Sequence, residues 1–188
     1  TIQNVKVVLD PTLLLERSCW LNMVDDNKKE GSYIFCYFLE MNIQKIRVAK
    51  KFAKENGYNI ISVPFEHEFG GEEKLPTYNK GIGPKEFLEL IYNADFVLTD
   101  SFHACAFSII YNKQFRVFSR EVGKQNMNDR LYTLLSYINK TDYFIETKEL
   151  SQVKVESECV YDYSKIDDMR NQSILWLKQA ICNFNCYH

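Results

Sequence analysis

The sequence predicts an α/β protein built on a doubly wound, Rossmann-like parallel sheet. Short runs of β-branched and aromatic residues alternate along the chain with segments whose apolar residues recur at helical spacing. Some of these runs, such as 32–39, are apolar throughout, which is typical of strands that are buried on both faces of a parallel sheet. The 188 residues suffice for one full core, and the net charge of -2 lacks the basic excess of nucleic-acid-binding proteins.

The first thirty residues predict one strand and a linker. The β-rich run 5–9 predicts a strand that ends at Asp10 and Pro11, because proline interrupts a strand ladder and favours a turn. Residues 12–20 predict a short helical or irregular segment. The polar stretch 25–31 contains glycine and few apolar residues, so we interpret it as a linker.

The next segments form a strand–helix–strand unit. Residues 32–39 predict a central strand, and 42–56 predict a helix whose apolar residues at 43, 46, 49, 52 and 53 share one face. Gly57 stands where helices commonly end in glycine. A second strand is predicted at 60–65, followed by a long loop at 66–83, and long loops in compact domains are often functional.

The second half of the chain continues the alternation. Pro84 opens a predicted helix that runs to Tyr92, since proline is favoured at the first helical position. The remaining predicted elements are a strand at 95–99, a helix at 101–111, a strand at 115–118, a helix at 129–138, a strand at 143–146 and a closing helix at 166–181.

The strongest chemical signal lies where the strand at 95–99 ends. Ligands of open parallel sheets bind beyond the carboxyl ends of strands, where the next helix presents free N–H groups. Asp100 and Ser101 follow this strand, and His103 falls in the first turn of the next helix. The alternative is that these polar residues only cap the helix and that His103 fills space.

These segments resemble the polysaccharide pyruvyl transferase family. That family commonly shows Thr-Asp-Ser-Phe-His-Gly or Arg-Leu-His after a strand, and residues 99–104 read Thr-Asp-Ser-Phe-His-Ala. The resemblance extends over 83–115. Two shorter matches occur in family order, Asp-Pro-Thr-Leu-Leu at 10–14 and Asn-Asp-Arg-Leu at 128–131.

The resemblance implies a two-domain enzyme with an architecture like that of the two-lobed glycosyltransferases. We interpret residues 1–30 as the tail of a missing N-terminal lobe with its linker, and 31–188 as the C-terminal Rossmann-like domain. The implied reaction transfers pyruvyl from phosphoenolpyruvate to paired hydroxyls of a surface-polysaccharide sugar and forms a ketal. The implied acceptor is a glycan or a lipid-linked saccharide, no cofactor is implied, and we expect the isolated chain to be inactive.

The resemblance also implies the site residues. His103 is the expected catalytic residue, since a histidine can move protons near neutral pH. The expected substrate-binding residues are Asp100, Ser101, Phe102, Ala104, Asn128 and Arg130. The chain departs from the family at Phe102, since no arginine precedes His103, and at Ala104, where glycine is usual. Arg130 is therefore the first candidate for a donor-binding cation, ahead of Arg120, Lys113 and Lys124.

Two other functions stay open from the residues alone. One is the donor lobe of a nucleotide-sugar glycosyltransferase, and the other is a catalytically silent relative that binds a glycan or a partner protein. We expect a cytoplasmic protein, because no apolar run is long enough to span a bilayer and no signal peptide is recognisable. We expect reduced cysteines and no metal site, since the tail 182–188 offers only three candidate ligands.

Overall fold

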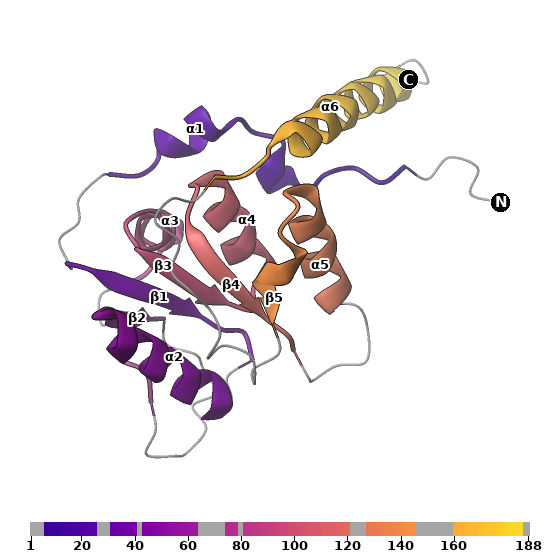
Figure 1. The fold of residues 1–188 in the computed structure, drawn as a ribbon. Helices are drawn as coiled ribbons and strands as arrows, with labels where there is room; N and C mark the ends of the chain where they lie inside the picture. Colours follow the sequence, from indigo (N-terminus) through magenta and orange to yellow (C-terminus); the bar gives the residue numbers. More distant parts are fainter. Residues whose placement is uncertain are drawn as a thin grey trace.

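Five parallel strands form the central sheet in the part of the chain that the structure describes (Figure 1). The computed structural model describes residues 6–25, 31–40, 43–63, 74–78, 81–120, 127–145 and 160–185. The strand order is β2-β1-β3-β4-β5, with β3 at the centre, and every neighbouring pair is parallel. The strands are β1 (Tyr33–Tyr37), β2 (Asn59–Ser62), β3 (Phe96–Thr99), β4 (Gln114–Phe118) and β5 (Phe144–Ile145).

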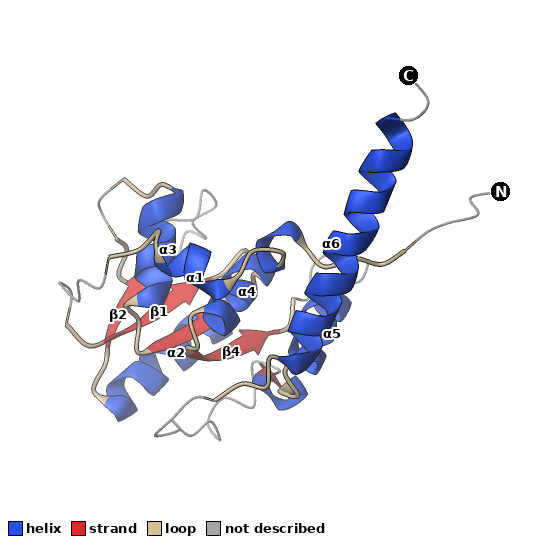
Figure 2. Cartoon of the chain, turned by 90° about the horizontal axis from the view of Figure 1, so that it is seen from above, coloured by secondary structure: helices blue, strands red, loops and turns tan. Residues whose placement is uncertain are grey.

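Helices cover both faces of this sheet, so the doubly wound fold predicted from the sequence is confirmed (Figures 1 and 2). Helix α2 packs on one face, whereas α3, α4 and α5 pack on the other. The helical elements are η1 (Pro11–Leu13), α1 (Arg17–Leu21), α2 (Ile43–Asn56), α3 (Pro84–Tyr92), α4 (Phe102–Ile110), α5 (Met127–Tyr137), η2 (Thr141–Tyr143) and α6 (Ser164–Asn185).

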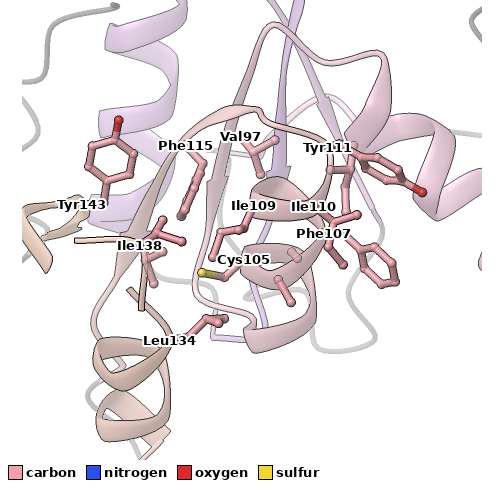
Figure 3. Close-up of a cluster of buried hydrophobic side chains, with 14 of the residues drawn as sticks. Val97, Cys105, Phe107, Ile109, Ile110, Tyr111, Phe115, Leu134, Ile138 and Tyr143 are labelled. Atoms are coloured by element: carbon pink, nitrogen blue, oxygen red, sulfur yellow. The ribbon is translucent and has the colours of Figure 1, made fainter. Parts of the chain in front are cut away.

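The strand side chains divide between two apolar clusters, one on each face. Phe35, Val97 and Phe115 belong to the cluster that contains the buried side chains of α3, α4 and α5 (Figure 3). Their sequence neighbours Ile34 and Phe96 belong to the cluster that contains the buried side chains of α2. This alternation follows from the two-residue repeat of a strand, and it explains why the runs are apolar throughout.

Local signals set several helix ends where the sequence predicts them. Gly57 follows α2 with a φ of +71°, a conformation that glycine adopts without steric cost. Pro84 opens α3, and the Glu86 side chain accepts a hydrogen bond from the Gly83 N–H at 2.9 Å. The predicted strand at 60–65 is shorter, because β2 ends at Ser62, and residues 64–73 lie outside the described part.

The predicted strand at 5–9 is wrong for the residues that the structure describes. Residues 6–10 pair with no described strand. Instead the Leu9 N–H donates to Oγ of Ser173 in α6 at 3.0 Å. The Leu9 side chain is buried in the apolar cluster that contains the buried side chains of α3, α4 and α5. Leu9 therefore anchors this segment in the core, whereas Val7 is 79% exposed, and the segment forms no strand. Leu9 and Leu13 both pack into this cluster, while the proposed division at residue 30 stays a prediction.

Helix α6 is longer than the predicted helix at 166–181, and it packs only along its first half. Ile166 and Ser173 are buried, whereas Leu175 and Ile181 are 58% and 62% exposed. The helix extends away from the sheet beyond this point (Figure 2). The described side chains from 178 onward are exposed.

No helix in the described ranges is long and apolar enough to cross a membrane.

Candidate functional site

The site lies at the topological switch point of the sheet. Strands β2 and β3 lie on opposite sides of β1. Helix α2 leads into β2 and helix α3 leads into β3, and these two helices cover opposite faces of the sheet. The carboxyl ends of β1 and β3 therefore lie at the position where open α/β sheets bind ligands. The turn after β3 carries Asp100 and Ser101 into this position.

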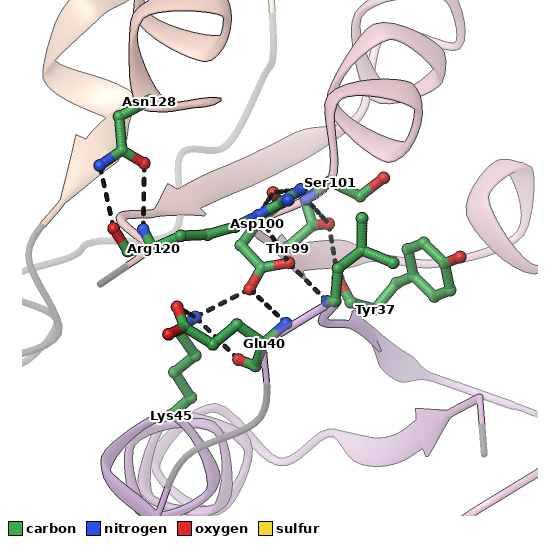
Figure 4. Close-up of polar contacts among 9 residues, drawn as sticks. Tyr37, Glu40, Lys45, Thr99, Asp100, Ser101, Arg120 and Asn128 are labelled. Atoms are coloured by element: carbon green, nitrogen blue, oxygen red, sulfur yellow. Dashed lines mark hydrogen bonds and ion pairs between the residues drawn. The ribbon is translucent and has the colours of Figure 1, made fainter. Parts of the chain in front are cut away.

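Asp100 ties this turn to the end of β1. Its carboxylate accepts hydrogen bonds from the N–H groups of Leu39 and Glu40, at 2.6 and 3.1 Å (Figure 4). The Nζ atom of Lys45 completes the contact at 2.8 Å and also donates to the Glu40 carbonyl. These three donors hold the turn that precedes α4, and the role of Asp100 in substrate binding stays a prediction.

Arg120 and Asn128 hold the same turn from the other side. Arg120 donates from Nε and Nη2 to the Asp100 carbonyl, at 2.9 and 2.6 Å. The Asn128 side chain accepts from the Arg120 N–H at 3.0 Å and donates to the Arg120 carbonyl at 3.1 Å (Figure 4). Asn128, a predicted substrate-binding residue, thereby links the start of α5 to the end of β4.

Ser101 is the N-cap residue of α4, but its side chain makes no capping hydrogen bond. Ser101 is 3% exposed, yet its hydroxyl makes no hydrogen bond to any described residue. Its backbone N–H donates to Oγ1 of Thr99, and its carbonyl accepts from the Cys105 N–H, which starts the helix. The first N–H groups of a helix have no partner within it and attract anions. The Ser101 hydroxyl adds a polar group at this end that makes no capping hydrogen bond.

His103 and Arg130 meet on the carboxylate of Asp10. Oδ1 of Asp10 lies 4.0 Å from Nε2 of His103, and Oδ2 lies 3.7 Å from Nη2 of Arg130. Oδ1 also accepts from the Thr12 N–H at 3.1 Å, which caps η1. The structure thus brings together the histidine and the arginine that the sequence singled out. The side chains of His103 and Arg130 are 60% and 54% exposed, so both are accessible to a ligand.

Phe102 and Ala104 take different places around His103. The guanidinium Cζ of Arg130 lies 4.5 Å from the centroid of the Phe102 ring, which is a cation–π contact. Phe102 therefore supports Arg130. Ala104 is fully buried in the core cluster of α4. In an Arg-x-His sequence the arginine stands two positions before the histidine, so the departure from the family lies at Ser101 and not at Phe102.

Sequence reasoning missed Lys45 and treated Asp10 only as a turn residue. Lys45 lies next to the apolar face of α2, but no periodicity reveals that a lysine is buried. Its partner Asp100 lies 55 positions later, and only the fold brings the two together. The Asp10 segment carried one signal, because residues 10–14 matched the family.

Two ionisable groups near the site stay neutral. Burial raises the pKa of Tyr37 at the end of β1, and the negative charge of Asp100 raises it further, against the opposing effect of Arg120. Burial also raises the pKa of the Cys105 thiol in α4, well above its usual range. A thiol without access to its thiolate is a poor nucleophile, so Cys105 is part of the core.

An all-parallel sheet with helices on both faces defines an α/β fold of the Rossmann-like, GT-B-like class. The family model for polysaccharide pyruvyl transferase matches residues 1–121, and the chain belongs to this family. It is therefore a member of a transferase family.

One solved structure supports the fold assignment. UDP-GlcNAc 2-epimerase from Methanocaldococcus jannaschii, in complex with UDP-GlcNAc and UDP, superposes with a TM-score of 0.54 at 11% identity, over 91% of this chain and 49% of that chain. A second structure of that epimerase gives a TM-score of 0.49 at 12% identity, over 86% and 49% of the two chains. This chain spans about half the length of the epimerase. No curated protein matches it significantly.

Proposed function

We propose that this chain is the phosphoenolpyruvate-binding half of a pyruvyl transferase that acts on a sugar of a surface polysaccharide. Family membership supports the transferase class. The observation that carries the proposal is the meeting of His103 and Arg130 at Asp10, beside a helix N-terminus with the uncommitted hydroxyl of Ser101. Phosphoenolpyruvate is an anion whose methylene carbon takes up a proton in this reaction. A cation and free N–H groups can bind the anion, and a histidine can carry the proton.

The overall reaction consumes two hydroxyl groups and one phosphoenolpyruvate. One sugar oxygen bonds to C2 of phosphoenolpyruvate as the methylene carbon takes up a proton and becomes a methyl group. The second oxygen bonds to the same carbon, and the C–O bond to phosphate breaks. One hydroxyl proton balances the proton taken up by carbon, and the other leaves with inorganic phosphate. The product is a ketal whose carbon carries a methyl group and a carboxylate.

Each part of the site has a role in this scheme. The N-terminal N–H groups of α4 and the Ser101 hydroxyl bind one anionic group of the donor, and Arg130 binds the other. His103 moves a proton to or from the reacting atoms. Asp100 and Asn128 keep the turn in place through their contacts with Lys45 and Arg120.

The acceptor belongs to a second lobe in this proposal. A transferase must hold donor and acceptor in contact, and much of its rate advantage comes from that positioning. We propose that the second lobe binds the glycan or lipid-linked saccharide, that the reaction occurs in the cytoplasm, and that this chain alone binds the donor without turnover.

Ligand-induced stabilisation tests the proposal directly. The purified chain is melted with phosphoenolpyruvate, with uridine diphosphate and without ligand, because a ligand that binds only the native state raises Tm. We expect phosphoenolpyruvate to raise Tm and uridine diphosphate to leave it unchanged. A rise with uridine diphosphate alone would instead support a nucleotide-sugar glycosyltransferase. No rise with either ligand would support the catalytically silent relative.

Turnover provides the second test. In a preparation that contains both lobes, His103→Ala should lower turnover by roughly 10²–10⁴-fold if His103 moves a proton. Unchanged turnover with weaker donor binding would assign His103 to binding alone.

A further inference from the structure

Asp10 is the one described carboxylate within 4.0 Å of both His103 and Arg130. Its side chain is 19% exposed, whereas the side chains of His103 and Arg130 are more than half exposed. These three residues come from η1, α4 and α5, which are far apart in the sequence. Asp10 contacts both the proposed proton carrier, His103, and the proposed phosphoenolpyruvate-binding cation, Arg130. It is therefore placed to affect both functions.

The position of Asp10 is fixed on both sides by α6. Before Asp10, the Leu9 N–H donates to Oγ of Ser173; after it, Nε of Arg170 donates to the Leu13 carbonyl at 2.8 Å. The Thr12 N–H binds Oδ1 of Asp10 itself, so the cap of η1 sets the direction of the carboxylate. The C-terminal helix therefore holds the Asp10 turn against the N-terminal end of α4.

We propose that Asp10 is a positioning residue that holds the proton of His103 on Nε2 and leaves Nδ1 as the nitrogen that exchanges a proton with substrate. The hydrogen bond made by one ring nitrogen decides the tautomer of the other. Nε2 faces Asp10 at 4.0 Å, and a shift of roughly 1 Å brings this pair to hydrogen-bond distance. Nδ1 makes no hydrogen bond to any described residue. The inference rests on the proposed function, because it assigns an atom to the proton transfer of His103.

Asp10 should weaken the binding of phosphoenolpyruvate, although it should help to position His103 for proton transfer. Its negative charge lies 3.7 Å from the Arg130 head and competes with an anionic donor for that cation. Removing the charge should therefore strengthen binding of phosphoenolpyruvate while it weakens control of the His103 tautomer. If Asp10 only supported the fold, its replacement would loosen the site and weaken the binding of phosphoenolpyruvate.

Tautomer measurement by NMR tests the Asp10–His103 contact without any substrate. The chain has three histidines, His67, His103 and His188, so ¹⁵N-histidine labelling gives few signals. A short histidine peptide supplies the reference tautomer ratio. We expect His103 to show a larger excess of the Nε2–H tautomer than this peptide. In Asp10→Asn this excess should fall to the level of the peptide. An unchanged tautomer ratio at His103 overturns the inference.

A second variant separates the contact from the cap. Asp10→Ser keeps an N-cap acceptor for Thr12, since serine caps helices well, but its hydroxyl is too short to reach His103 and Arg130. It should lose the His103 tautomer excess with little change in Tm. If only a destabilised variant loses the excess, the role is structural and the inference fails.

Calorimetric titration with phosphoenolpyruvate supplies the second readout. Asp10→Asn should bind phosphoenolpyruvate roughly 2–10-fold more tightly, as expected for removal of a solvent-screened charge about 4 Å from the binding cation. Weaker binding than in the unmodified chain overturns the inference. If the unmodified chain binds no phosphoenolpyruvate, the proposed function fails, and the tautomer measurement alone decides whether Asp10 controls His103.

Discussion

Nζ of Lys45 lies 2.8 Å from Oδ2 of Asp100, and neither side chain is exposed to solvent. The two residues join α2 to the turn that leads into α4, which makes this buried ion pair the main polar link beneath the candidate site. Breaking a buried pair by removing one partner leaves an uncompensated charge in the interior. The pair is therefore the clearest place to test whether the turn is held as the structure describes.

Lys45→Met should lower the free energy of unfolding by about 3–5 kcal/mol, the usual cost of a broken buried pair. Urea unfolding measures the change. Lys51→Met on the same helix is the matched control, because Lys51 and its partner Glu55 are 58% and 56% exposed. Exposed pairs of this kind contribute about 0–1 kcal/mol. Equal losses for the two variants would show that Lys45 is not buried against Asp100.

Ser101→Ala should weaken phosphoenolpyruvate binding but leave the free energy of unfolding almost unchanged. Truncation of an N-cap serine normally lowers the free energy of unfolding by about 1 kcal/mol, but the Ser101 hydroxyl makes no capping hydrogen bond. Ser108→Ala is the control in the same helix, since the Ser108 hydroxyl donates to the Ala104 carbonyl at 2.7 Å. That variant should keep donor affinity. A stability loss at Ser101 with unchanged affinity would return Ser101 to a capping role.

Arg130→Ala should reduce phosphoenolpyruvate affinity by roughly 10-fold or more, since hydrogen bonds to charged groups contribute about 1.5–3 kcal/mol. Arg130→Lys should recover only part of this loss, because an ammonium lacks the planar fork that stacks on Phe102 and binds an anion with two donors. Lys178→Ala removes an exposed charge from α6 and controls for net charge. Equal binding by the Ala and Lys variants of Arg130 would exclude a direct contact with the donor.

Much of the fold was predictable, because it depends on local patterns. The helix at 84–92 has its start set by Pro84 and Glu86, which act on their immediate neighbours. The error at 5–9 has the opposite cause. A strand needs a neighbouring strand as well as β-rich residues, and the neighbour of Leu9 is a helix more than 160 positions away.

The candidate site was predictable only in part. His103 and Arg130 were identified from motif resemblance, and the structure brings them together. Asp10, which contacts both of them, and Lys45, which holds Asp100, depend on contacts between distant segments. An aspartate at a turn and a lysine in a helix are ordinary surface residues in a sequence. Nothing in their local pattern indicates that one is buried or that the other binds a histidine.

The cysteines should differ sharply in reactivity. Cys19 and Cys182 are exposed, whereas Cys36 and Cys105 are buried, and burial raises the pKa of both buried thiols. Iodoacetamide labelling of the native chain, read by peptide mass spectrometry, should modify Cys19 and Cys182 first. The buried pair should react only in urea. Rapid native labelling of Cys105 would contradict the packing of α4 shown in Figure 3.

Tyr111 predicts how stability depends on alkaline pH. Burial raises the pKa of this tyrosine to about 12, with a smaller contribution from Tyr92. A tyrosine in the unfolded chain titrates near pH 10, so between about pH 10 and 12 the unfolded state loses a proton that the folded state keeps. The contribution of Tyr111 is therefore complete below about pH 10 and is lost as pH rises through about 12. Ionisation of the buried phenol favours unfolding in this window.

Tyr111→Phe should remove this pH dependence and the hydrogen bond of the Tyr111 hydroxyl to the Trp20 carbonyl, which is 3.3 Å long. At neutral pH the variant should be less stable by about 0.5–1.5 kcal/mol, the usual contribution of one hydrogen bond. Above about pH 10 its stability should fall less steeply than that of the unmodified chain, so the two curves converge. Urea unfolding at pH 7, 9, 10 and 11 measures both effects, with Tyr132→Phe as the control because that ring is 51% exposed. Parallel curves for the unmodified chain and Tyr111→Phe would show that the Tyr111 phenol is not buried beside α1, since only burial separates its titration in the two states.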